Sequence, residues 1–395
     1  MPAADRDPTS PKPRPSEREL FEAALALPPD RRPSMVREAC GDDDALERRL
    51  LRLLAAHDEA AAATGGTNAI TGELLRAVDP EQVGPYRVQR RIGAGGMGIV
   101  YLAEQTAPIR RRVALKLVRA GMRTEDVVGR FLLERQALAR MDHPCIARIF
   151  DSGATDDDLP YFVMEYVPGE PLNAYCDTHD LSLRARVELF VQIVRAVQHA
   201  HTKGVIHRDL KPSNVLVAEV DGEPMPKVID FGVARAIDRD GEDELVMTQV
   251  GHLVGTPAYM SPEQFDTESV DLDTRTDIYA LGVMLYELLA GSLPCAVDGR
   301  APQRFEEVRR AVCELDPQRP SVRVAALGEH ATAVAARRAE SPTRLVQSLR
   351  GDLDRLVMKA IARDRALRYA TAEDLARDLE RYLANEPVTA TPPSR

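Results

Sequence analysis

The 395-residue sequence predicts an α+β fold of two lobes, in which a strand-rich part precedes a helix-rich part. Two observations carry this prediction. Short runs of β-branched and aromatic residues recur between Tyr86 and Tyr166, and apolar residues recur at helical spacing from Leu181 onward. No repeat with a period of roughly 20–50 residues is visible, so a solenoid is not expected.

The composition is that of a soluble globular chain, with 44% apolar and 29% charged residues. The net charge of −10 disfavours a nucleic-acid partner, because phosphate contacts need cationic surface. Five widely spaced cysteines without a C-x-x-C pair argue against a disulfide or zinc framework and favour a reducing compartment. No signal-peptide core or membrane-spanning run is present, so we expect a cytoplasmic protein, unless a longer chain adds a membrane tether after Arg395.

The N-terminal part predicts a small unit attached to the main domain. Residues 1–16 are Pro-rich and polar, and we expect them to be disordered. Residues 17–82 predict a helical extension and linker, with apolar stripes over 17–27 and 35–58 and a Gly- and Thr-containing tract at 61–68. Whether this extension is a separate unit or only docks on the rest of the chain stays open.

Residues 83–385 predict the main domain, with a first lobe at 83–167, a second lobe at 168–385 and a tail at 386–395. One helix, about Glu125–Met141, interrupts the strands of the first lobe. The expected strands are Tyr86–Ile92, Ile99–Ala103, Val113–Val118, Ile146–Asp151 and Tyr161–Tyr166.

A glycine-rich segment, Ile-Gly-Ala-Gly-Gly-Met-Gly-Ile-Val, runs from Ile92 to Val100. Glycines let a backbone approach phosphate closely and expose its N–H donors. A dinucleotide-binding turn would be followed by a helix, whereas a strand-like run follows here. The pattern therefore favours a glycine-rich β-hairpin.

Two charged residues stand where apolar ones are expected. Lys116 lies within the apolar strand Val113–Val118, and burying an unpaired ammonium is costly. Glu134 shares the apolar stripe of the following helix, because Val127, Phe131, Glu134 and Leu138 follow spacings of 4, 3 and 4. We expect Lys116 and Glu134 to pair, although an edge-strand lysine that reaches solvent is the alternative for Lys116.

Two loops supply oxygen ligands. His-Arg-Asp-Leu-Lys-Pro-Ser-Asn, residues 207–214, lies between two short strands and provides Asp209, Lys211 and Asn214. Asp-Phe-Gly at 230–232 follows another strand. A carboxylate can orient a hydroxyl and accept its proton, and carboxylate and amide oxygens bind hard cations.

These five motifs, in this order, resemble the Hanks-type (eukaryotic-like) bacterial serine/threonine protein kinases over about Tyr86 to Leu383. The resemblance implies the two-lobed protein kinase fold, with a β-sheet and αC helix in the first lobe and helices in the second. It also implies ATP and Mg²⁺ as cofactors, and transfer of the γ-phosphate to Ser/Thr hydroxyls of protein substrates.

By resemblance, Asp209 is the catalytic base or hydroxyl-orienting group beside Lys211, and Asn214 and Asp230 hold Mg²⁺. Lys116 contacts the α- and β-phosphates and pairs with Glu134. Met164 resembles the gatekeeper and 165–167 the hinge. The residues implied to bind ATP are Ile92, Gly93, Ala94, Gly95, Gly96, Met97, Gly98, Val100, Ala114, Lys116, Met164, Glu165, Val167 and Leu216.

Further resemblances concern the specificity for Ser and Thr and a structural ion pair. Lys211 and the Gly-Thr-Pro-Ala-Tyr stretch at 255–259 are typical of Ser/Thr kinases, in which Thr256 would bond Asp209 and Lys211. Glu263, in Ser-Pro-Glu rather than the usual Ala-Pro-Glu, is expected to pair with a buried Arg368. A solvent-exposed arginine is the alternative.

Asp277, at the start of an apolar helix, is expected to bond the backbone of the catalytic loop or to act as a cap. Thr248 is the remaining hydroxyl residue before Ser261, and we expect it to be an activating phosphosite that pairs with Arg208; an unmodified loop threonine is the alternative. The activity would then include autophosphorylation in trans between associating copies.

Two other functions fit the sequence less well. A pseudokinase scaffold would usually lack one of five residues that are all present here: Lys116, Glu134, Asp209, Asn214 and Asp230. A Rossmann oxidoreductase does not fit the strand that follows the glycines. The sequence does not identify the protein substrate, the activating signal or the oligomeric state.

Overall fold

The structure is a computed structural model of the 395-residue chain, which divides into two compact units, 1–82 and 83–395. The residues it describes are 20–21, 23–24, 27, 31–41, 43, 46–48, 50–52, 54, 79–95, 98–118, 141–155, 159–231, 257–265, 272–296 and 305–390.

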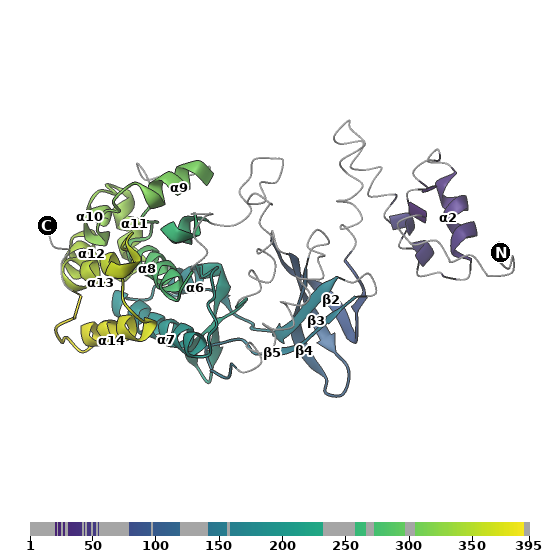
Figure 1. The fold of residues 1–395 in the computed structure, drawn as a ribbon, viewed down its shortest axis with the longest axis horizontal. Helices are drawn as coiled ribbons and strands as arrows, with labels where there is room; N and C mark the ends of the chain where they lie inside the picture. Colours follow the sequence, from purple (N-terminus) through teal and green to yellow (C-terminus); the bar gives the residue numbers. More distant parts are fainter. Residues whose placement is uncertain are drawn as a thin grey trace, which may run out of the picture. The chain divides into compact units, whose positions relative to one another are not determined.

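The described part of the first unit is helical (Figure 1). Helix α2 (Arg32–Cys40) carries Pro33 in its first turn, where a missing N–H costs nothing, and ends at Gly41, whose φ is +58°. Gly41 therefore ends α2 within the apolar stripe over 35–58, because it leaves the helical conformation. Apolar side chains from three helical stretches form a small core: Leu20, Phe21, Ala24, Val36, Cys40, Leu50 and Leu54.

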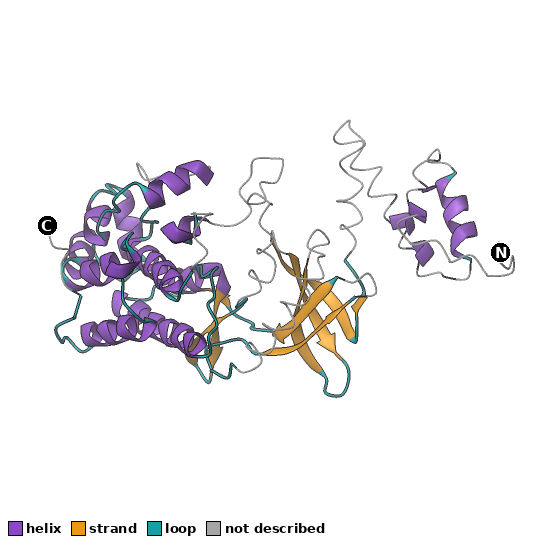
Figure 2. Cartoon of the chain, viewed as in Figure 1, coloured by secondary structure: helices purple, strands orange, loops and turns teal. Residues whose placement is uncertain are grey.

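The first lobe of the second unit is a six-stranded sheet with the order β1-β2-β3-β4-β6-β5 (Figure 2). Its strands lie close to the predicted ones, although β5 begins three residues later than expected. The expected helix over 125–141 falls on 119–140, outside the described residues. The strands are β1 (Gln82–Val83), β2 (Tyr86–Gly95), β3 (Gly98–Gln105), β4 (Arg111–Val118), β5 (Ile149–Ala154) and β6 (Pro160–Glu165).

The two faces of this sheet bury different clusters, because side chains alternate along each strand. One face packs Tyr86, Tyr101, Leu115 and Val163 together. The other face packs Ala114, Val118, Phe162 and Met164 with Val100 beside them. The second face therefore gathers residues that the sequence assigned to adenine binding.

The glycine-rich segment forms the predicted hairpin. Gly93 pairs with Val100 and Gly95 with Gly98 in the antiparallel ladder between β2 and β3. A Cβ at Gly98 would lie 2.2 Å from the backbone oxygen of Leu117 on β4. Only a glycine permits this close approach of the two strands.

The second lobe is mainly helical and carries a small sheet in the order β7-β8-β9. The strands are β7 (Glu170–Pro171), β8 (Val215–Val220) and β9 (Glu223–Val228), and the β8–β9 turn is Asp221-Gly222, both with positive φ. The helices are α6 (Leu172–Thr178), α7 (Leu183–Thr202), α8 (Arg275–Ala290), α9 (Phe305–Cys313), α10 (Pro320–Ala325), α11 (His330–Ala336), α12 (Pro342–Leu349), α13 (Asp352–Ala360) and α14 (Ala372–Leu383). Four 3₁₀ turns complete the lobe: Pro212–Asn214, Pro257–Tyr259, Pro262–Gln264 and Arg365–Leu367.

Helix α8 is the centre of this lobe and is apolar on every side, as expected for a helix surrounded by others. Its last carbonyl groups accept hydrogen bonds from a buried arginine of the segment after α11. Arg338, 2% exposed, donates to the backbone oxygens of Leu288 (2.9 Å), Leu289 (2.6 Å) and Val334 (2.8 Å). Burial, together with nearby Arg186, lowers the pKa of Arg338 to about 10.

Among the helices of the described residues, none combines the length and the hydrophobicity that crossing a bilayer requires.

Candidate active site

Lys116 and Asp230 meet between the lobes. Lys116 on β4 is 6% exposed, and its Nζ lies 3.0 Å from Oδ2 of Asp230, just after β9. A buried ammonium requires such an anionic partner. Asp230 has φ +62°, a left-handed conformation that is uncommon outside glycine and is found where the surrounding structure imposes it. The expected partner of Lys116, Glu134, lies outside the described residues.

Asp209 is held by two neighbours on the catalytic loop. Lys211 Nζ donates to Asp209 Oδ2 at 2.7 Å, and Asn214 Nδ2 donates to the same oxygen at 3.1 Å and to the Asp209 backbone oxygen at 2.8 Å. The side chain of Asp209 is 35% exposed, so its carboxylate is accessible from solvent. Because the amide nitrogen of Asn214 is committed to Asp209, its carbonyl oxygen is the atom left to bind a cation.

Asp277, in the first turn of α8, holds the backbone of the loop 207–214, as the sequence predicted. Its carboxylate is fully buried and accepts hydrogen bonds from the backbone N–H groups of His207 and Arg208, each at 2.8 Å. Arg208 has φ +68°, and the two bonds from Asp277 fix the backbone at this strained residue.

His201, at the end of α7, is a residue that sequence reasoning missed. Its Nε2 lies 2.8 Å from Asp277 Oδ2. Burial alone would raise the pKa of Asp277, but the hydrogen bond from His201 and the backbone bond from His207 outweigh burial, so this pKa is lowered. The available signal was a histidine in the last helical turn before the catalytic loop.

The catalytic loop also contacts the segment that carries Asp230. His207 Nε2 donates to the Ile229 backbone oxygen at 3.0 Å, and the His207 ring lies 4.6 Å from the ring of Phe231. These contacts fix the position of Asp230 relative to Asp209.

The residues assigned to adenine binding fall into two neighbouring groups. Val100, Ala114 and Met164 belong to one apolar cluster of the first lobe, and Val167 and Leu216 to another. Met164 also lines a cavity of about 10 Å³ whose far wall is Asp230 and Phe231, room for about one water molecule. Ile92, Gly93, Ala94, Gly95 and Gly98 lie on the β2–β3 hairpin, and Gly96 and Met97 are outside the described residues.

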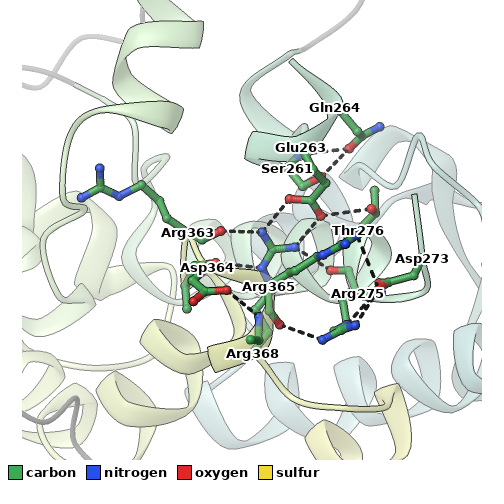
Figure 3. Close-up of polar contacts among 12 residues, drawn as sticks. Ser261, Glu263, Gln264, Asp273, Arg275, Thr276, Arg363, Asp364, Arg365 and Arg368 are labelled. Atoms are coloured by element: carbon green, nitrogen blue, oxygen red, sulfur yellow. Dashed lines mark hydrogen bonds and ion pairs between the residues drawn. The ribbon is translucent and has the colours of Figure 1, made fainter. Parts of the chain in front are cut away.

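Glu263 and Arg368 form the buried pair that was expected (Figure 3). Arg368 Nη1 and Nη2 donate to the two carboxylate oxygens at 2.7 and 2.8 Å, and the Arg368 side chain has no exposed surface. The remaining donors reach the backbone oxygens of Ala362, Arg363 and Arg275. Every N–H of this guanidinium thus has an acceptor.

Gln264, beside Glu263, links this turn to the catalytic loop. Its Nε2 donates to the Arg208 backbone oxygen at 3.0 Å, and its Oε1 accepts from the Ser261 backbone N–H at 2.9 Å. Sequence reasoning did not single it out. Its place directly after Ser-Pro-Glu was the only available signal.

Residues 86–377 match the protein kinase domain family. The chain belongs to the protein kinase family. This kinase domain is 34% identical to serine/threonine-protein kinase PknB of Mycobacterium tuberculosis over 77% of this chain and 44% of that protein. It is 41% identical to serine/threonine-protein kinase Pkn1 of Myxococcus xanthus over 58% of this chain and 33% of that protein.

Among solved structures, a double mutant of the Mycobacterium tuberculosis PknI kinase domain is similar, with a TM-score of 0.54 and 25% identity. The similarity covers 76% of this chain and 97% of that one. The chain therefore spans less than half of the length of the curated relatives named above. Together these findings establish the two-lobed protein kinase fold and the bacterial serine/threonine kinase family that the sequence indicated.

The kinase domain offers oxygen donors that suit Mg²⁺. The carbonyl oxygen of Asn214 and the carboxylate of Asp230 are hard ligands, and Mg²⁺ in kinases takes few protein ligands because the substrate phosphates supply others. The residues that the structure describes hold no cluster of three or more His, Cys, Asp or Glu side chains that would bind a metal without a nucleotide. This donor set fits a cation that arrives with ATP. Thr248 and Thr256 lie outside the described residues.

Proposed function

We propose that this protein is an active serine/threonine protein kinase that uses ATP and Mg²⁺. The observation that carries the proposal is the convergence of Asp209, Lys211 and Asn214 on one loop beside the Lys116–Asp230 pair. A pseudokinase scaffold would not need this complete set, and the names of the relatives also favour an active enzyme.

The residues divide the work of phosphoryl transfer. The substrate hydroxyl oxygen forms a bond to the γ-phosphorus, and the bond from that phosphorus to the bridging oxygen of ADP breaks. Asp209 orients the hydroxyl and takes its proton, while Lys211, 2.7 Å from Asp209, is placed to neutralise charge on the transferred group. Asn214 and Asp230 would hold Mg²⁺, which supplies positive charge to the phosphate oxygens when bound.

Lys116 serves the phosphates. Its ammonium lies 3.0 Å from Asp230, and ATP would offer it phosphate oxygens as further acceptors. The β2–β3 hairpin covers the phosphates with backbone N–H groups, and the cluster of Val100, Ala114 and Met164 provides the apolar surface for adenine.

Two further proposals concern the acceptor hydroxyls and the cellular compartment. Lys211 favours Ser and Thr hydroxyls of proteins as acceptors, including Thr248 of a second copy in transient self-association. Five free cysteines, four of them buried, favour a reducing compartment such as the cytoplasm.

The test is incubation of the full chain with [γ-³²P]ATP, Mg²⁺ and a generic protein acceptor, beside Asp209→Asn. We expect label on Ser and Thr in the wild type only, with part of the label at Thr248 by mass spectrometry. Equal labelling of both proteins, or of neither, would contradict the proposed activity. Label confined to tyrosine would contradict the substrate class.

A further inference from the structure

A second hollow lies on the reverse side of the hinge. Its volume is about 310 Å³, at the small end of the range for small-molecule sites, and its lining is His143, Pro144, Arg148, Phe150, Glu165 and Lys227. Met164 packs on the face of the sheet that the sequence assigned to adenine, and Phe150 borders the cluster on the other face. Because Glu165 follows Met164 on β6, its side chain points to the face of Phe150, away from the nucleotide.

Glu165 joins three segments around this hollow. Its Oε1 lies 2.8 Å from Lys227 Nζ on β9, and its Oε2 accepts from the Arg148 backbone N–H at 3.2 Å. Its own N–H donates to the Arg148 backbone oxygen at 2.8 Å. Lys227 is three residues before Asp230 on the same segment, so the ion pair links the hinge to the strand that delivers the proposed magnesium ligand.

The charges around the hollow favour an anionic occupant. Lys227 donates to Glu165 and has further N–H donors, and the Arg148 side chain is 63% exposed, held by a surface ion pair to Asp142 that contributes little. The Arg111 guanidinium lies 3.7 Å from the centre of the Phe150 ring. His143 adds no charge at neutral pH, because burial and neighbouring His199 lower its pKa.

Two cations, Lys227 and Arg148, therefore line the hollow beside one carboxylate, Glu165, and Arg111 stacks on its Phe150 wall. Phe150 and Pro144 supply flat apolar surface between them. A ligand that matches both features has a carboxylate for Lys227 and Arg148 and a planar apolar body for Phe150.

We propose that this hollow binds a small aromatic carboxylate, and that the bound ligand weakens ATP binding by drawing Lys227 away from Glu165. The coupling rests on the proposed function. A ligand carboxylate competes with Glu165 for the same ammonium, which loosens the link between the hinge and β9. Because coupling between two binding sites is reciprocal, nucleotide must weaken binding of the carboxylate by the same factor.

The experiment uses 4-fluorobenzoate as the probe and follows its ¹⁹F NMR signal during titration with the full chain. We expect saturable binding that falls at least fivefold in Lys227→Met and several-fold in Arg148→Gln. Lys203→Met is the matched control, since Lys203 is an exposed lysine after α7, and it should bind as the wild type does. Circular dichroism and melting temperature verify that each variant is folded, and Arg148→Gln tests the site even if Lys227→Met does not fold.

Repeating the titration with Mg²⁺ and a non-hydrolysable ATP analogue separates the two sites. We expect the dissociation constant of the probe to rise about two- to tenfold and then reach a plateau. A rise without a plateau means that the probe occupies the adenine site, which overturns the proposal, as does binding unchanged by both substitutions or the absence of saturable binding. Failure of the analogue itself to bind would refute the proposed function, whereas Lys227-dependent probe binding would still support the site.

Discussion

Replacing Glu263 by glutamine tests the reasoning about the buried pair with Arg368. The substitution keeps the shape and one acceptor oxygen of the side chain but removes its charge. Arg368 would then keep its three backbone acceptors while its positive charge, with no exposed side-chain surface, loses its counter-ion. The pKa of Glu263 shows that the pair stabilises the ionised form: burial acts to raise it, but the Arg368 hydrogen bonds lower it overall.

The expected cost is large because the Arg368 side chain is fully buried and the Glu263 side chain is only 13% exposed. Removing one member of a buried ion pair costs about 3–5 kcal/mol, since the other charge remains without compensation. A domain of this size loses roughly 2 °C of melting temperature per kcal/mol. We therefore expect Glu263→Gln to melt about 6–10 °C below the wild type.

Thermal unfolding monitored by circular dichroism at neutral pH measures this difference. Glu306→Gln is the matched control, because the Glu306–Arg309 pair is at the surface, with Glu306 71% exposed, and its loss should leave the melting temperature unchanged. A Glu263→Gln protein that melts within 1 °C of the wild type would show that the pair contributes no net stability. The reasoning from burial would then be wrong.

Two further substitutions test the positioning of the site. Gly98→Ala places a Cβ 2.2 Å from the Leu117 backbone oxygen, so we expect thermal melting to show about 1–3 kcal/mol of destabilisation, together with a raised KM for ATP. Gly93→Ala is the control: its Cβ would meet nothing closer than 3.8 Å, so this variant should melt as the wild type does. Asp277→Asn should cost about 2–3 kcal/mol at pH 7 in urea unfolding and lower kcat. The folded-state pKa of Asp277 is lowered below its usual 3.8, so the stability that its charge contributes is complete above that value and is lost as pH falls through the folded pKa. The difference in unfolding free energy between the wild type and Asp277→Asn should therefore shrink in acid. A difference that does not depend on pH would contradict this.

The residues of the site were predictable because short motifs with fixed local geometry carry them. The hairpin of Gly93, Gly95 and Gly98 follows from glycine spacing and a strand on each side. Asp209, Lys211 and Asn214 meet because they share one loop of eight residues, 207–214. Asp277 could be assigned only by resemblance, since its partners His207 and Arg208 are about seventy residues away in sequence.

Other partners could not be predicted, because no local pattern encodes which distant groups meet. The buried Lys116 needed an anion, and in the described residues that anion is Asp230. No local pattern marks Arg338 as a core residue, yet it is buried against the end of α8. In the same way, nothing local indicated that Glu165 would pair with Lys227.

The sequence by itself determined the family and the order of the lobes and indicated the candidate reactive residues, because these depend on residue type and on spacing within a few turns of chain. Apart from the Glu263–Arg368 pair, which the resemblance implied, the tertiary structure decided how the buried charges are paired. Desolvation makes each buried charge require a partner, but the identity of that partner is set by which segments pack together. For this kinase domain the packing joins Lys116 to Asp230, Asp277 to His201 and Glu165 to Lys227.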